Sequence, residues 1–184
     1  MKRFAVILCG CGNRDGSEIH ESVMTMLAID KSENAYEIFA PDIEQYHVIN
    51  HLNGKEMSEK RNVLVEAARI ARGNIKDLSM LKVIDFDAIV FPGGFGVAKN
   101  LFTYAIEGIN AKVNSEVERI IKETHTVGKP IGALCISPVL IAKVLKGITV
   151  TVGQDKSTAD DVVKMGANHI NAIQTDVVSD RKNK

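Results

Sequence analysis

The fold is decided by one short stretch of sequence, Ile131-Gly132-Ala133-Leu134-Cys135-Ile136-Ser137-Pro138. The apolar and small residues up to Leu134 predict a buried strand, and a proline such as Pro138 suits the first turn of a helix. Small residues before Cys135 permit a sharp turn that holds the thiol at the carboxyl edge of a sheet, beside a helix N-terminus that favours thiolate. The stretch predicts a nucleophile elbow; a cysteine buried at a strand end is the alternative.

Strands and helices alternate along the chain on either side of this stretch. Short apolar runs predict strands at residues 4–8, 36–39, 87–91, 131–134 and 149–152. Helices are predicted at residues 18–29, 58–73, 113–121 and 160–165, and one starts near Pro138. The expected helix caps include Ser17 and Ser58, residues 42–57 are expected to be irregular, and residues 170–178 to form one or two short strands. The alternation predicts an α/β fold whose parallel sheet has helices on both faces.

Composition excludes several classes of function. The 184 residues include 23 basic and 23 acidic side chains, so the formal net charge is zero and no nucleic-acid partner is expected. The longest apolar run, Phe4 to Cys9, is far too short for a membrane helix, and the N-terminus has no signal-peptide pattern. We therefore expect one domain, residues 1–184, in the cytoplasm and without a membrane partner.

The cysteines and glycines do not form a known metal or nucleotide motif. Cys9, Cys11 and Cys135 are an odd number with no zinc-ligand spacing, which fits free thiols in a reducing compartment. The loop Pro92-Gly93-Gly94-Phe95-Gly96 is neither a dinucleotide fingerprint nor a Walker loop. We expect no metal and no cofactor.

The same glycine loop is a candidate oxyanion-binding element. It follows a predicted strand, and glycines leave backbone N–H groups free to approach a ligand oxygen. In an elbow enzyme this loop supplies one donor, and the N–H after the nucleophile, that of Ile136, supplies another. A simple tight turn is the alternative.

Two carboxylates open the first predicted helix. Glu18 and Glu21 are three residues apart, so both can lie on one helix face. Acidic residues in a first turn commonly only complement the helix dipole. The functional alternative is a carboxyl group that donates to a thiolate or moves a proton at the sheet edge where all three loops meet.

The three segments together resemble the ThiJ/PfpI superfamily, whose members are related to the class-one glutamine amidotransferases. More narrowly, the chain is similar to the ElbB branch, named for enhancing the biosynthesis of lycopene, an isoprenoid. The matching stretches are Gly10-Cys11-Gly12, Asp15-Gly16-Ser17-Glu18-Ile19-His20-Glu21, Phe39-Ala40-Pro41-Asp42, Val48-Ile49-Asn50-His51-Leu52, Arg61-Asn62-Val63-Leu64 and Pro92-Gly93-Gly94-Phe95-Gly96.

The resemblance implies a flavodoxin-like three-layer α/β/α sandwich with a mostly parallel sheet, usually assembled as a homodimer. It also implies a glyoxalase-type activity that converts glyoxal, a small reactive aldehyde, to glycolate without metal, glutathione or another cofactor. Some members are described instead as deglycases of early glycation adducts. By the family motif, Cys135 is the nucleophile and Glu21 the glutamate that contacts it, with Glu18 as second choice. The oxyanion and substrate-binding donors correspond to Gly93, Gly94 and Ile136.

Two departures from the family pattern leave other functions open. Many members have a histidine directly after the nucleophile or in the next helix, whereas this chain has Ile136 and no histidine from Ser137 to Gly147. The family's usual C-terminal strand and helix are not recognised before Lys184. The second hypothesis is therefore a non-enzymatic thiol redox sensor or an accessory protein of isoprenoid biosynthesis. A third is an amidohydrolase, whose leaving group needs a general acid.

Overall fold

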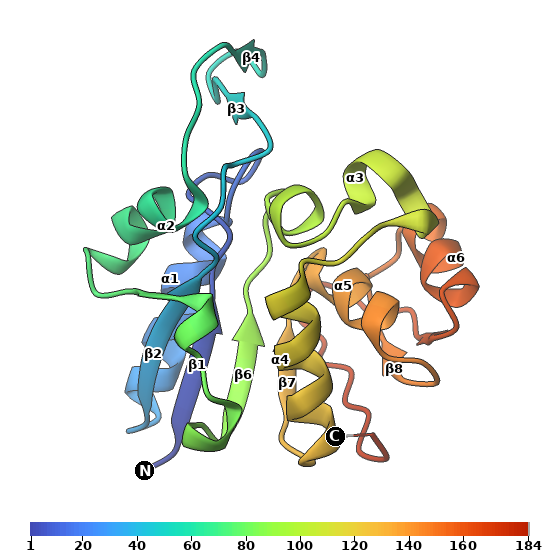
Figure 1. Ribbon diagram of the computed structural model, residues 1–184. Coiled ribbons are helices and arrows are strands. Elements are labelled where there is room, and N and C mark those ends of the chain that lie inside the picture. Colours follow the sequence, from blue (N-terminus) through green and yellow to red (C-terminus); the bar gives the residue numbers. More distant parts are fainter. Residues whose placement is uncertain (184) are drawn as a thin grey trace.

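A computed structural model describes residues 1–183 and contains a central parallel sheet between helical layers (Figure 1). The five strands are β1 (Arg3–Ile7), β2 (Ala35–Ala40), β5 (Lys76–Asp77), β6 (Ala88–Phe91) and β7 (Ile131–Ala133). Their order is β5-β2-β1-β6-β7, and every neighbouring pair is parallel. Because these strands are all parallel, the loops after β1, β6 and β7 lie at the same edge of the sheet.

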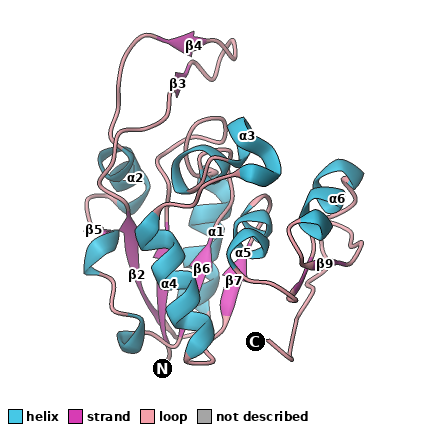
Figure 2. Ribbon diagram, turned by 45° about the vertical axis from the view of Figure 1, so that its right-hand side comes forward, coloured by secondary structure: helices cyan, strands magenta, loops and turns pink. Residues whose placement is uncertain are grey.

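Helices cover both faces of the sheet (Figure 2). The helices α1 (Ile19–Lys31) and α2 (Val63–Ala71) pack on one face, and α4 (Ser115–Thr126) and α5 (Ser137–Val144) on the other. Side chains of β1 alternate between the two cores: Val6 and Leu8 face α1 and α2, whereas Ala5 and Ile7 belong to the core under α4 and α5. The expected flavodoxin-like three-layer sandwich is confirmed.

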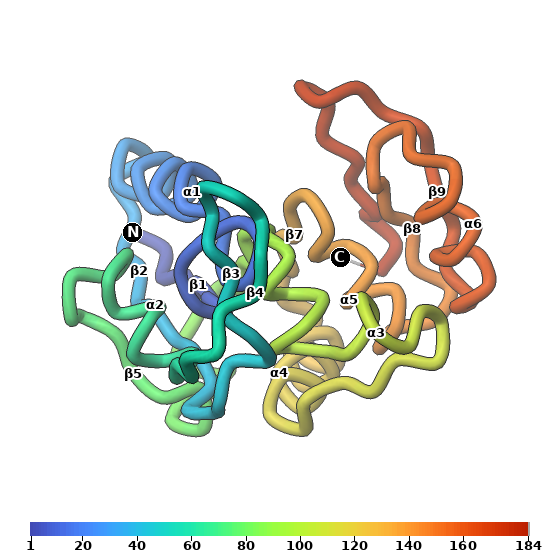
Figure 3. Tube along the Cα trace, turned by 90° about the horizontal axis from the view of Figure 1, so that it is seen from above, coloured from blue at the N-terminus to red at the C-terminus, as the bar shows by residue number. Residues whose placement is uncertain are grey.

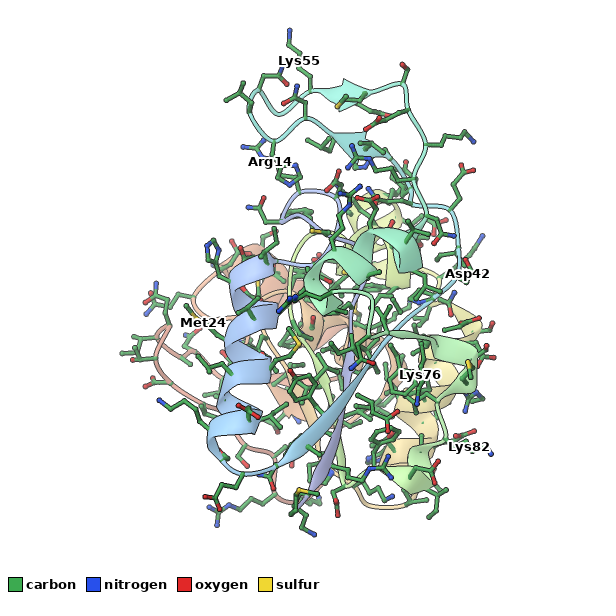
Figure 4. All side chains as sticks on the ribbon, turned by 90° about the vertical axis from the view of Figure 1, so that its left-hand side faces the viewer. Arg14, Met24, Asp42, Lys55, Lys76 and Lys82 are labelled. Carbon is green, nitrogen blue, oxygen red and sulfur yellow. The ribbon has the colours of Figure 1, made fainter. Side chains whose placement is uncertain are left out.

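Smaller elements extend from this frame. The antiparallel pair β3 (Val48–Ile49) and β4 (Glu56–Met57) forms an arm above the sheet, with Lys55 at its tip, far from Met24 on α1 (Figure 4). The helices α3 (Tyr104–Glu107) and α6 (Lys156–Lys164) and the parallel pair β8 (Thr149–Val150) and β9 (Asn168–His169) lie on the side away from α1 (Figure 3). Short 3₁₀ turns occupy Leu78–Met80, Val83–Asp85 and Gly108–Asn110. The strands expected at residues 170–178 do not form in the described structure.

Two expected helix caps are wrong. The cap of α2 is Asn62 rather than Ser58, and its side-chain oxygen accepts the N–H of Val65 at 3.0 Å. The cap of α1 is Glu18 rather than Ser17, because the Ser17 hydroxyl accepts the N–H of Cys9 at 2.8 Å and is already occupied by that contact. The segment 42–57 is irregular as expected, apart from β3 and β4.

A buried amide ties the loops at this edge together. Asn100 lies in the π-helical turn η3 (Val97–Leu101), which follows the glycine loop. Its Nδ2 donates to the carbonyls of Cys9 and Asp15 at 2.9 and 3.0 Å, and its Oδ1 accepts the N–H of Tyr46 at 3.0 Å. One side chain thus joins the loop after β1 to the segment that leads to the β3–β4 arm.

Candidate active site

Cys135 lies on a strained turn between β7 and α5. Its φ angle of 57° is in the left-handed region, which a non-glycine residue adopts only under constraint. Leu134 donates its N–H to Phe91 at 3.1 Å, and the buried hydroxyl of Ser137 donates to the carbonyl of Pro92 at 2.9 Å. These bonds hold both sides of the turn, and Cys135 itself is solvent-exposed with a free thiol. The geometry is that of a nucleophile elbow.

The glycine loop approaches the sulfur with its backbone. The N–H groups of Gly94 and Ile136 both lie near the thiol of Cys135, where they act to lower its pKa. Gly94 has φ of 107°, and a Cβ there would collide with the backbone of Gly16 and Glu18. Only glycine therefore fits between the loop after β1 and the elbow. The two N–H groups that the sequence assigned to an oxyanion site lie beside the sulfur.

Glu21 reaches the same place from the first turn of α1. Its Oε2 accepts the N–H of Gly93 at 2.7 Å, and its carboxylate lies close enough to Cys135 for its negative charge to raise the pKa of the thiol. A Cβ at Gly93 would stand 2.5 Å from this Oε2 and would also collide with the side chain of Cys135. Of the two candidate glutamates, Glu21 is therefore the one whose carboxylate lies against the sulfur.

Glu18 has a different position. Its Oε2 accepts the N–H of Glu21 at 2.7 Å as the cap of α1, and its Oε1 lies 3.0 Å from Nδ1 of His20. Burial raises the pKa of Glu18, but the hydrogen bonds from Glu21 and His20 outweigh it and place the pKa below its ordinary value. Glu18 is therefore an ionised carboxylate held within its own helix turn.

The thiol of Cys135 is not ionised in advance. Although Cys135 is exposed as a residue, its sulfur lies against the glycine loop and Glu21. This local burial and the negative charge of Glu21 raise the pKa of the thiol above its ordinary value, although the N–H groups of Gly94 and Ile136 oppose the shift. The thiolate favoured by the helix N-terminus in the sequence analysis is thus not what the full environment produces. The thiol needs a base, and the Glu21 carboxylate is the acidic group that lies beside it.

The histidines have other contacts. Lys99 faces Nε2 of His47, His51 bonds the carbonyl of Ile49, and the N–H of Val152 donates to His169. His20 pairs with Glu18, and Nδ1 of His125 is buried without a partner. Within residues 1–183 no histidine is hydrogen-bonded to Cys135, so the site is built from a cysteine, a glutamate and backbone amides.

The other cysteines differ from Cys135. Burial raises the pKa of Cys9 to about 12, and Cys11 is half-buried. No group of three histidine, cysteine or acidic residues suited to a metal ion occurs among the described residues. None of the helices in the described part of the chain is both long and apolar enough to cross a membrane.

The role of Asn100 was not predicted from the sequence, because it depends on contacts with separate loops.

The parallel α/β sandwich, which presents a strained cysteine beside a glutamate, has the fold of solved structures of the DJ-1 superfamily. No protein-family model matches the chain. Human glutamine amidotransferase-like class 1 domain-containing protein 3, mitochondrial, is 48% identical over 192 residues, covering 99% of this chain and 72% of that protein. The rat ES1 protein homolog, mitochondrial, is 49% identical over 193 residues, with the same coverage. The chain belongs to this family of glutamine amidotransferase-like class 1 and ES1 proteins.

Solved structures agree with this assignment. The crystal structure of an isoprenoid biosynthesis protein with an amidotransferase-like domain from Ehrlichia chaffeensis has a TM-score of 0.93 and 39% identity, over 100% of this chain and 84% of that chain. A mutant of a DJ-1 superfamily protein from Salmonella typhimurium has a TM-score of 0.57 and 21% identity, over 94% and 75% of the two chains. The second likeness concerns the fold alone.

Proposed function

We propose that this protein is a cofactor-independent glyoxalase-type enzyme that converts glyoxal and similar small aldehydes to hydroxy acids through a hemithioacetal on Cys135. The observation that carries the proposal is that the thiol of Cys135, an exposed residue, lies beside both a carboxylate and two backbone N–H groups. These are the groups that addition of a thiol to a carbonyl requires: a nucleophile, a proton acceptor and donors for the new oxyanion.

The first step forms a carbon–sulfur bond. The thiol proton of Cys135 passes to the Glu21 carboxylate as the sulfur adds to one aldehyde carbon. The carbonyl oxygen becomes an alkoxide that the N–H groups of Gly94 and Ile136 stabilise. Glu21 then returns the thiol proton to this alkoxide, which gives the hemithioacetal and leaves Glu21 as a carboxylate for the next step. Because the thiol pKa is raised, this transfer to Glu21 is what makes the sulfur nucleophilic at neutral pH.

The second step moves a proton between the two carbons of the substrate. Glu21 removes the hydrogen from the sulfur-bearing carbon to give an enediol and returns a proton to the neighbouring carbon, which leaves a thioester of the hydroxy acid. Water then cleaves the thioester, releases glycolate and restores the thiol. One carbon is oxidised and the other reduced, so the reaction glyoxal plus water to glycolate balances without an outside oxidant or reductant.

The comparisons support this proposal at the level of the superfamily. The fold likeness to DJ-1 superfamily structures agrees with the proposed glyoxalase or deglycase activity, and the ElbB branch remains our finer proposal. The Ehrlichia chaffeensis structure, named as an isoprenoid biosynthesis protein, supports that branch. Both the human and the rat relatives are named as mitochondrial proteins, and the cytoplasmic location of this chain stays a prediction. The homodimer also stays a prediction, which light scattering tests.

The direct experiment follows glycolate formation from glyoxal. We expect turnover by the wild-type protein, none above background for Cys135→Ser, and a loss of about a hundredfold for Glu21→Gln, a common size for a general-base effect. The matched control is Cys11→Ser, which removes a half-buried free thiol on the neighbouring loop and should keep full activity. Equal glycolate yields from wild type and Cys135→Ser would refute the enzyme.

One alternative has an observation in its favour. Cys135 is exposed and open to oxidation. This favours, as the alternative, a protein that is a non-enzymatic thiol redox sensor or an accessory protein that affects isoprenoid biosynthesis. The raised pKa of the thiol argues against rapid oxidation, because thiolate is the form that peroxide attacks. Selective oxidation of Cys135 by dilute peroxide, together with no aldehyde turnover, would favour the sensor. An amidohydrolase is less well supported, since no histidine contacts the thiol within residues 1–183.

A further inference from the structure

Three hydrogen bonds form a closed ring between α1 and the glycine loop. The N–H of Glu18 donates to the carbonyl of Gly93 at 2.9 Å, and the N–H of Gly93 donates to Oε2 of Glu21 at 2.7 Å. The N–H of Glu21 in turn donates to Oε2 of Glu18 at 2.7 Å. The ring joins the backbone and side chains of both glutamates to a single residue of the loop, Gly93.

This ring is a modified helix capping box, in which hydrogen bonds to Gly93 replace one of the two usual bonds. In an ordinary capping box, the side chain at the third helical position turns back to accept the N–H of the cap residue. Glu18 is the cap of α1 and Glu21 is that third residue. Here the carbonyl of Gly93 has taken the cap N–H, so the Glu21 carboxylate does not turn back on its own helix. It accepts the N–H of Gly93 instead, and this places it against the thiol of Cys135.

We propose that Glu18 is a positioning residue, which holds the Glu21 carboxylate against the Cys135 thiol by capping the first turn of α1. What it supplies is an acceptor oxygen for the N–H of Glu21, and its negative charge is not required. Its second partner, His20, is almost fully exposed, and an exposed pair of this kind contributes little. The effect on turnover rests on the proposed function, whereas the effect on the thiol does not.

The test therefore measures the thiol directly. The rate of iodoacetamide alkylation of Cys135 is followed against pH by mass spectrometry of the peptide that carries it. Glu21→Gln removes the charge beside the sulfur and should lower the midpoint of the pH profile. Glu18→Ala should move the midpoint in the same direction, because the first turn of α1 loses its cap and no longer holds the Glu21 carboxylate at the thiol.

Conservative variants separate capping from charge. Glu18→Gln keeps an oxygen that can accept the N–H of Glu21, and Glu18→Ser introduces a preferred cap residue, so both should keep a midpoint close to wild type. His20→Ala is the matched control and should also leave it unchanged. The double variant Glu18→Ala with Glu21→Gln should match Glu21→Gln alone, because Glu18 acts through Glu21.

Three results would overturn the proposal. One is a wild-type profile in Glu18→Ala, and another is a Glu18→Gln profile that matches Glu18→Ala, since the charge would then be what matters. The third is a double variant in which the midpoint shifts of the two single variants add.

Thermal unfolding of each variant shows that the fold is kept, and Glu18→Gln and Glu18→Ser still test the proposal if Glu18→Ala does not fold. Because no aldehyde is used, a protein without glyoxal turnover leaves this test intact. Where turnover is present, Glu18→Ala should reduce kcat about tenfold through misplacement of the base.

Discussion

The carboxylate of Glu21 accepts the backbone N–H of Gly93 at 2.7 Å, and this bond spans 72 positions of sequence. It places an acid from the first helix on the loop that follows β6, directly beside the elbow after β7. The bond uses one carboxylate oxygen, and the same carboxylate lies beside the Cys135 thiol. The bond between Glu21 and Gly93 therefore fixes the carboxylate beside the nucleophile, where it raises the pKa of the thiol.

A side chain at Gly93 should disable the site. In Gly93→Ala the new Cβ would lie 2.5 Å from Oε2 of Glu21 and 3.1 Å from the sulfur of Cys135, so both groups must move. We expect turnover of glyoxal to fall at least tenfold, since small misplacements of reacting groups are costly. Steady-state kinetics measure the effect.

The control for that variant is Gly132→Ala on β7. Its Cβ would meet Val90 at 3.4 Å, which a small adjustment accommodates. Activity and thermal stability should both stay near wild type. An equal loss of activity in the two variants would show that the space beside Glu21 is not what matters.

The pH dependence of Cys135 alkylation should lie to the alkaline side of a free cysteine. Burial and the Glu21 charge raise the pKa of the thiol, so the folded protein should reach half-maximal alkylation above the ordinary value of about 8.5. The raised pKa disfavours thiolate, and removal of the charge in Glu21→Gln therefore shifts the midpoint to lower pH. The denatured protein serves as the reference, and a native midpoint below it would contradict the prediction.

The three cysteines should differ sharply in reactivity. Burial raises the pKa of Cys9 to about 12, and its N–H and sulfur both face Ser17 in the interior. We expect Cys135 to be alkylated in the native protein at pH 9 while Cys9 stays unlabelled until guanidinium is added. Peptide mapping gives the rates for each position. Comparable labelling of Cys9 and Cys135 without denaturant would argue against this packing.

Asn100→Ala should destabilise the loops that carry the site. The substitution leaves the carbonyls of Cys9 and Asp15 and the N–H of Tyr46 without their partner. Unsatisfied buried groups cost about 1–3 kcal/mol each, so we expect a loss of roughly 2–4 kcal/mol, partly relieved by water. At this chain length the corresponding fall in Tm is about 5–12 °C.

The matched control is Asn53→Ala in the exposed turn of the β3–β4 arm. Its side chain only accepts the N–H of Lys55 at 2.9 Å, in contact with solvent. We expect a change within about 0.5 kcal/mol in the free energy of unfolding. If Asn53→Ala and Asn100→Ala melt at the same temperature, the amide of Asn100 does not hold the loops together.

Much of the fold could be predicted because its signals are local. Apolar runs such as Phe4 to Leu8 specify strands buried on both faces, and their alternation with helical stripes specifies a parallel sheet. The cap of α2 could not be placed this way, since Ser58 and Asn62 are both good cap residues. The structure places the start of the helix at Asn62, beside the residues where the N–H of Gln45 donates to the carbonyl of Arg61 across the base of the arm.

The sequence by itself determined the alternation of strands and helices, the turn that exposes Cys135 and the pair of acids that open α1, because each is a property of neighbouring residues. Only the tertiary structure decided that Glu21 contacts the sulfur and Glu18 caps the helix. It also decided that the thiol pKa is raised rather than lowered. The physical reason is the same in each case. Gly93 and the groups around the Cys135 sulfur come from segments that are distant in sequence. No local sequence pattern encodes how close these groups lie to the sulfur or how far they shield it from water.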